Sequence, residues 1–85
     1  MMYMYRIKVI YEGVLLGYFC GWDMFYIDVD FDRYLEFVTK RFVAKVLKNI
    51  CSNPRYKTGW DFVIQKQSFT FSNLAIWKDI LKGCE

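Results

Sequence analysis

The 85-residue sequence contains no histidine, one proline and three cysteines. Imidazole is the commonest general base and metal ligand in proteins, so its absence removes the usual residue for acid–base catalysis and for metal binding. Cys20, Cys51 and Cys84 are odd in number and form no CxxC pair, and we expect three reduced thiols rather than a zinc site. We therefore predict no catalytic residue, no metal site and no cofactor.

Long apolar runs are also missing. The chain has no stretch of about 18 apolar residues, which a membrane-spanning helix requires. The first residues lack the apolar segment of a signal peptide. The length suits one small domain, placed at residues 1–85. These features predict a cytoplasmic protein that does not contact a membrane.

Aromatic residues are abundant, with three Trp, seven Tyr and eight Phe, or 21% of the chain. A hydrophobic share of 55% beside 25% charged residues excludes a disordered chain. A core of this size needs fewer aromatic side chains, and Tyr and Trp near a surface often contact partners. The composition therefore indicates a contact surface, with a densely packed aromatic core as the alternative.

The net charge of +3 is too small to indicate nucleic-acid binding by itself. The distribution of charge is more informative. Residues 23–36 hold five acidic side chains and one basic one, whereas residues 37–60 hold six basic side chains and no acidic one. We expect an acidic side and a basic side on the folded domain.

Three strands are predicted in the first part of the chain. Residues 3–11 alternate between apolar and polar side chains, Glu12-Gly13 is typical of a tight hairpin turn, and residues 14–20 form a second strand that is apolar on both faces. Within that strand, Gly17 predicts a bulge or a close backbone approach. Residues 24–29 form the third strand, and residues 34–38 are either extended or a lead-in to a helix.

A basic amphipathic helix follows. Thr39 is the expected N-cap and Pro54 lies beyond the helix end. The expected buried face consists of Phe42, Val43, Val46, Leu47 and Ile50. Residues 55–59 form a polar loop and residues 60–67 a fourth strand.

A second helix is predicted over residues 73–82, where the spacing of Leu74, Trp77, Ile80 and Leu81 places them on one helical face and Gly83 follows as a stop. This face packs on the sheet or contacts a partner, including a second copy of the chain in a homodimer. The predicted class is α+β. Its elements run strand-strand-strand-helix-strand-helix, in a small, mainly antiparallel sheet with the first helix packed on one face.

Candidate chemistry centres on Asp28-x-Asp30-x-Asp32. Alternate carboxylates on a strand share one face and can bind a hard cation, but a calcium loop beginning at Asp28 requires Gly and Glu where Arg33 and Thr39 stand. A solvated strand edge and an acidic patch that faces a partner remain. Neither a glycine-rich phosphate loop nor a Ser or Cys with a histidine base is present. The chain is therefore not expected to be an enzyme.

Two kinds of interaction site are consistent with this pattern. In a protein-interaction module, the aromatic anchors and the acidic patch that steers association would be Tyr18, Trp22, Tyr26, Trp60, Asp28, Asp30 and Asp32. The alternative is nucleic-acid binding through the basic helix 40–50 and loop 55–57. Its phosphate-neutralising residues would be Lys40, Arg41, Lys45, Lys48, Arg55 and Lys57.

A further indication is a run of motifs along residues 3–66. They are Tyr5-x-Ile7-Lys8-Val9, the turn at Gly13, Leu15-x-Gly17-Tyr18, an Asp-rich stretch, Phe37-x-Thr39-Lys40 and Trp60-Asp61-Phe62-Val63-Ile64. The pattern resembles small proteins encoded by bacterial phages and mobile elements. That resemblance implies a phage-derived inhibitor of host defence, such as the anti-CRISPR proteins. It also implies a bacterial protein or ribonucleoprotein partner in the host cytoplasm.

Overall fold

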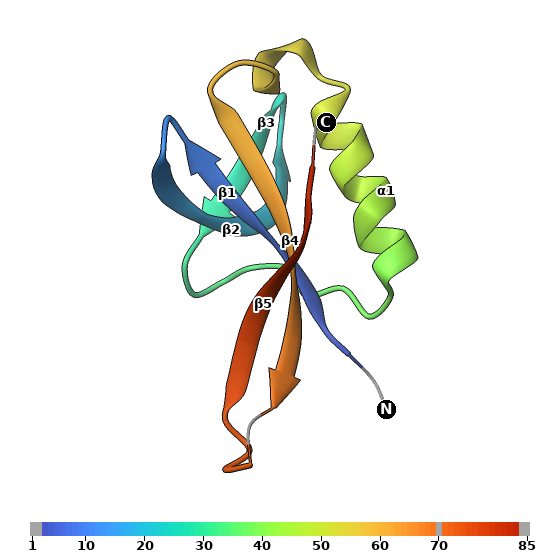
Figure 1. The fold of residues 1–85 in the computed structure, drawn as a ribbon. Helices are drawn as coiled ribbons and strands as arrows, with labels where there is room; N and C mark the ends of the chain where they lie inside the picture. The colour runs from blue at the N-terminus through green and yellow to red at the C-terminus, as the bar shows by residue number, and fades with distance from the viewer. Residues whose placement is uncertain (1–2, 70, 84–85) are drawn as a thin grey trace.

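In the computed structural model, which describes residues 3–69 and 71–83, five antiparallel strands form one sheet and one α-helix packs on a face of it (Figure 1). The strands are paired in the order β3-β2-β1-β4-β5, which places the first strand of the chain at the centre. The elements are β1 (Tyr5–Tyr11), β2 (Val14–Asp23), β3 (Tyr26–Asp30), α1 (Lys40–Cys51), the 3₁₀ turn η1 (Pro54–Tyr56), β4 (Trp60–Phe69) and β5 (Ala75–Lys82). The predicted antiparallel sheet and basic helix are confirmed.

The hairpin between β1 and β2 follows from its turn residues. Glu12 and Gly13 have φ angles of 48° and 80°, as a tight hairpin turn with two left-handed residues requires. Gly17 has a φ of 142°, and a Cβ at this position would lie 3.1 Å from the carbonyl carbon of Asp30. The close backbone approach predicted at Gly17 is therefore confirmed, because β2 and β3 leave no room there for a side chain.

Helix α1 begins where the sequence predicts. The Thr39 hydroxyl accepts a hydrogen bond from the Phe42 backbone N–H at 3.2 Å, which satisfies one free donor of the first turn. Val43, Leu47 and Ile50 are buried and belong to one core with apolar side chains of β1 and β4. Burial of each such aliphatic side chain contributes about 1.5–3 kcal/mol. Phe42, expected on the buried face, is instead 56% exposed.

The core fixes two faces of the sheet. Ile7, Val9, Phe62 and Ile64 are buried beneath α1, and we call their side the helix face. Since side chains of a strand alternate, the residues between them point away from the helix. We call that side the open face. Its members include Arg6, Lys8, Tyr18, Gln65, Trp77 and Asp79.

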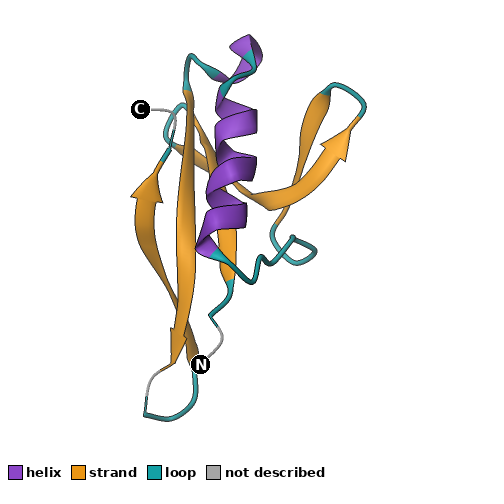
Figure 2. Cartoon of the chain, turned by 90° about the vertical axis from the view of Figure 1, so that its right-hand side faces the viewer, coloured by secondary structure: helices purple, strands orange, loops and turns teal. Residues whose placement is uncertain are grey.

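Strands β2 and β3 curve away from the helix, as the side view shows (Figure 2). The segment that remained open in the sequence, residues 34–38, is extended rather than helical. Phe37 exchanges two backbone hydrogen bonds with Tyr5, at 2.8 and 2.7 Å, and the Leu35 N–H donates to the Phe19 carbonyl oxygen at 3.0 Å. This segment fills the place beside the beginning of β1 that β2 leaves when it curves outward.

The predicted helix over residues 73–82 is wrong, since residues 75–82 form strand β5. The described elements therefore run β-β-β-α-β-β, and the predicted order is corrected in its last member. Apolar residues spaced for one helical face also suit a strand here, because the register with β4 shifts between Ile64 and Gln65 and changes which side chains share a face. Ser72 or Asn73 would have been the N-cap of that helix, and Asn73 instead has a φ of 60° in the connection between β4 and β5.

Two expectations about the environment of the chain can be compared with the structure. No helix within residues 3–69 and 71–83 is both long and apolar enough to cross a membrane. Cys51 is disulfide-bonded, whereas Cys20 is a free thiol. The expectation of three reduced thiols is therefore wrong at Cys51, and Cys84 lies outside the described residues.

Candidate interaction site

A groove lies between β3 and the 3₁₀ turn η1, and local sequence explains both walls. The Asn53 side chain accepts a hydrogen bond from the Arg55 N–H at 3.0 Å, and Pro54 occupies the start of the turn. The turn buries the ring of Tyr56, whose hydroxyl accepts a hydrogen bond from the Ile27 N–H at 2.8 Å. That bond ties the edge strand β3 to η1 and holds the two walls in place.

The groove has a volume of about 220 Å³ and an apolar, aromatic lining. Its residues are Leu16, Tyr26, Ile27, Val29, Arg55, Tyr56 and Trp60. The Arg55 guanidinium lies 4.1 Å from the centre of the Tyr26 ring, a cation–π contact at the rim. The Trp60 ring is held edge to face against Tyr56 with centroids 5.0 Å apart. Fixed aromatic walls with one arginine are typical of protein-binding hot spots.

Two of the four expected anchors, Tyr26 and Trp60, line the groove, and Trp22 belongs to the neighbouring strand β2. Tyr26 is 53% exposed, and Trp60 is half-buried in the groove. Trp22 is 49% exposed and is the cross-strand partner of Ile27, which lines the groove. Tyr18 is not part of this surface, because it points to the open face.

The three aspartates do not form a metal site. The Asp30 carboxylate accepts hydrogen bonds from the backbone N–H groups of Asp32 and Arg33, at 2.7 and 3.2 Å, and these bonds lower its pKa. Asp30 therefore shapes the loop after β3, while Asp28 and Asp32 are exposed. Within the described part of the chain no cluster of three or more His, Cys, Asp or Glu side chains is placed to hold a metal ion.

Cys20 lies next to these aspartates. Its Sγ donates to the Arg33 carbonyl oxygen. Burial, followed by the charges of Asp28 and Asp30, raises the pKa of the thiol. A raised pKa reduces the thiolate fraction at neutral pH, so this position lacks the activation that a nucleophilic cysteine requires.

The six cations of the nucleic-acid hypothesis are all exposed. Their members are Lys40, Arg41, Lys45, Lys48, Arg55 and Lys57. Four of them lie on α1, whose first turn carries no acidic residue, and two belong to the segment that follows it. Only Arg55 lines the groove. The structure therefore brings one residue of the basic set together with the aromatic anchors.

On the open face the structure assembles a second cluster, which the sequence did not predict. The Arg6 guanidinium lies between two rings, 3.6 Å from the Tyr18 centroid and 4.1 Å from that of Trp77, and Tyr34 lies 5.1 Å away. Arg6 Nε donates to Gln65 Oε1 at 2.8 Å. The alternation of Arg6 with buried apolar residues indicates that its side chain lies on the face opposite the core. Its contact with Trp77 could not be predicted, because that contact requires β5 to be a strand.

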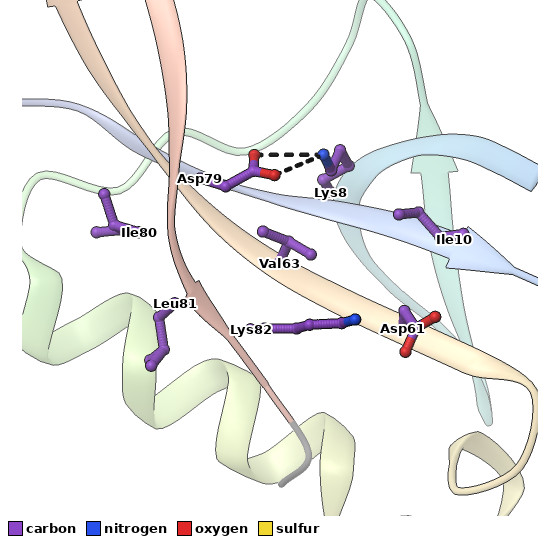
Figure 3. Close-up of a pocket in the computed structure, with 8 residues that line it drawn as sticks. All are labelled: Lys8, Ile10, Asp61, Val63, Asp79, Ile80, Leu81 and Lys82. Carbon is purple, nitrogen blue, oxygen red and sulfur yellow. Dashed lines mark hydrogen bonds and ion pairs between the residues drawn. The ribbon is translucent and has the colours of Figure 1, made fainter. Parts of the chain in front are cut away.

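Gln65 connects this arginine to a carboxylate. Its Nε2 donates to Asp79 Oδ1 at 2.7 Å, and Lys8 Nζ forms an ion pair with Asp79 at 3.0 Å. The hydrogen bond from Gln65, and then those from Lys8 and its charge, lower the pKa of Asp79. The Lys8–Asp79 pair borders a hollow of about 380 Å³ across β1, β4 and β5 (Figure 3). In the same view, Lys82 extends towards Asp61 at the other end of the hollow.

Neither a protein-family model, nor a curated protein, nor a solved structure matches this chain. The groove and the open face are therefore the features of the molecule that bear on its function.

Proposed function

We propose that the protein is a non-enzymatic interaction module that binds a partner protein through the groove between β3 and η1. The observation that supports this most directly is the gathering of Tyr26, Trp60 and Arg55 around one apolar groove. Tyr, Trp and Arg are the residue types that dominate binding energy in protein interfaces, and here they come from segments far apart in the sequence. Trp22 extends the same surface along β2.

The partner segment should present an apolar or aromatic side chain next to an acidic one. A groove of about 220 Å³ has room for a side chain rather than for a helix or a strand. Arg55 at the rim favours a neighbouring carboxylate. The resemblance to phage and mobile-element proteins makes a bacterial defence protein or ribonucleoprotein the first partner to test, in the cytoplasm of the host.

Photo-crosslinking tests the proposal at the groove itself. A benzophenone amino acid at position 26 should crosslink to one host protein, whereas the same group at exposed Tyr3, outside the groove, should not. Arg55→Glu should weaken binding of that protein by roughly thirty-fold, the equivalent of about 2 kcal/mol for a hot-spot residue.

Lys57→Glu is the matched control, because it makes the same change of charge two residues away and does not line the groove. A smaller effect of Lys57→Glu supports recognition in the groove. Equal losses for the two variants, or crosslinks of equal yield from positions 3 and 26, would refute the proposal.

Nucleic-acid binding is the second candidate, and one observation favours it. The basic side chains of α1 are exposed and none forms an ion pair within residues 3–69 and 71–83, so they are free to neutralise phosphates. Binding of an oligonucleotide that weakens steeply with salt, and that is lost in a Lys45→Glu, Lys48→Glu double variant, would support this candidate. Salt-independent or undetectable binding would exclude it.

A further inference from the structure

We infer that the open face of the sheet carries a binding site for a carboxylate, with the Arg6 guanidinium as its recognition group. This site lies on the opposite side of the sheet from the core and is independent of the groove in the proposed function. Its expected ligand is an aspartate or glutamate side chain of a protein.

Arg6 is buried without a carboxylate partner. Its side chain is only 9% exposed, and the one acceptor that it meets among the described residues is the neutral amide oxygen of Gln65. Gln65 stands between the guanidinium and Asp79, whose charge is already paired with Lys8. An arginine is charged at all ordinary pH values, and a buried charge is expected to be paired.

The donors that remain on Arg6 are accessible. Nε is used by Gln65, and neither Nη atom has a hydrogen-bond acceptor within residues 3–69 and 71–83. Every buried side-chain nitrogen or oxygen in the same part of the chain has a partner, so these Nη atoms must be reached by solvent. The end of the guanidinium therefore presents two parallel donors, the geometry that binds a carboxylate in a bidentate manner.

The surrounding rings make this donor pair rigid. The centres of the Tyr18 and Trp77 rings lie 3.6 and 4.1 Å from the central carbon of the guanidinium, and the Tyr34 ring lies 5.1 Å away, so three rings restrict its movement. A guanidinium that is already ordered loses little side-chain entropy when a ligand binds.

The neighbouring charges favour a single carboxylate over a chain of phosphates. Asp61 and Asp79 line the adjoining hollow and would repel a polyanion, whereas Lys82 in the same hollow forms no ion pair with any residue that the structure describes (Figure 3). A peptide with one acidic side chain at Arg6 has room to continue along this hollow of about 380 Å³.

The Nε–Hε signal of Arg6 in ¹⁵N-labelled protein provides the test. The probes are the capped peptides Ac-Ala-Glu-Ala-NH₂ and Ac-Ala-Gln-Ala-NH₂, inorganic phosphate and a short single-stranded oligonucleotide, all at constant ionic strength. We expect a saturable shift of the Nε–Hε signal with the glutamate peptide, and a dissociation constant at least about ten-fold higher for the glutamine peptide. Arg6→Lys, which keeps the charge but not the paired donors, should weaken binding by a similar factor.

Three results would contradict the proposed carboxylate site. No saturable shift in the wild-type protein, an equal response to the two peptides, or tighter binding of phosphate or the oligonucleotide would each overturn the carboxylate site. The comparison of the two peptides on the wild-type protein is decisive by itself if Arg6→Lys does not fold. Arg55→Glu should leave these shifts unchanged, so a failure here is distinct from a failure of the groove.

Discussion

The hydrogen bond from the Ile27 N–H to the Tyr56 hydroxyl offers a direct test of how the edge of the sheet is held. Tyr56→Phe removes the acceptor and keeps the ring, which is buried among core side chains and packs against Trp60 and Phe62. The substitution therefore changes one hydrogen bond without opening a cavity the size of a side chain. Its effect measures how strongly β3 is attached to η1.

The expected magnitude follows from the surroundings of the bond. A backbone donor that loses its partner costs about 1–3 kcal/mol, and the lower value applies here because Ile27 is half-buried and water can reach it. We therefore expect Tyr56→Phe to lower the free energy of unfolding by about 1 kcal/mol. For a domain of this size that loss lowers the midpoint temperature by roughly 4–8 °C.

Urea unfolding and amide hydrogen exchange measure the two consequences. The midpoint should fall, and the Ile27 amide should exchange faster than the amides of β1. Tyr11→Phe is the control, since the hydroxyl of this exposed tyrosine has no hydrogen bond within the described residues. If Tyr56→Phe and Tyr11→Phe are equally stable and Ile27 stays protected, the idea that this bond fastens the edge strand is refuted.

Two further predictions concern the sheet and its open face. Gly17→Ala places a Cβ against the backbone of Asp30 at an unfavourable φ. We expect this to lower the free energy of unfolding, measured with urea, by about 1–3 kcal/mol. An unchanged urea midpoint would contradict the close approach of the two strands. Hydrogen bonds from Gln65 and Lys8 lower the pKa of Asp79 in the folded protein. The ionised carboxylate therefore stabilises the folded state at pH values above its ordinary pKa of 3.8, and this contribution is lost as the pH falls through the lower pKa of the folded state. Stability measured between pH 6 and pH 2 should therefore decline less in Asp79→Asn than in the wild type, and identical profiles would argue against the network.

The elements that local chemistry specifies were predicted correctly from the sequence. A threonine that caps α1 and a Glu-Gly pair that turns the first hairpin act within a few residues, so their effect does not depend on distant parts of the chain. Strand β5 is different. Its apolar spacing suits a helix, and only pairing with β4, including the register shift near Gln65, makes it a strand. A tertiary partner overrides local preference in that segment.

The candidate sites also contain features that local sequence predicts and features that depend on distant segments. Exposure of Tyr26 and Trp22 could be anticipated from the excess of aromatic residues. Their meeting with Arg55 could not, because it requires η1 to fold back against β3. The environment of Arg6 was hidden for the same reason, since Trp77 reaches it only from the last strand.

The central position of β1 also has a consequence for the order in which the protein is made. Its partner on one side is the adjacent hairpin strand, but its partner on the other side, β4, begins at Trp60. When only the first three strands have left the ribosome, β1 is still an outer strand of the sheet, and its side chains Ile7 and Val9 are not yet covered by α1 and β4. Pairings so distant in sequence close slowly, so completion of this domain must wait for its last third to emerge.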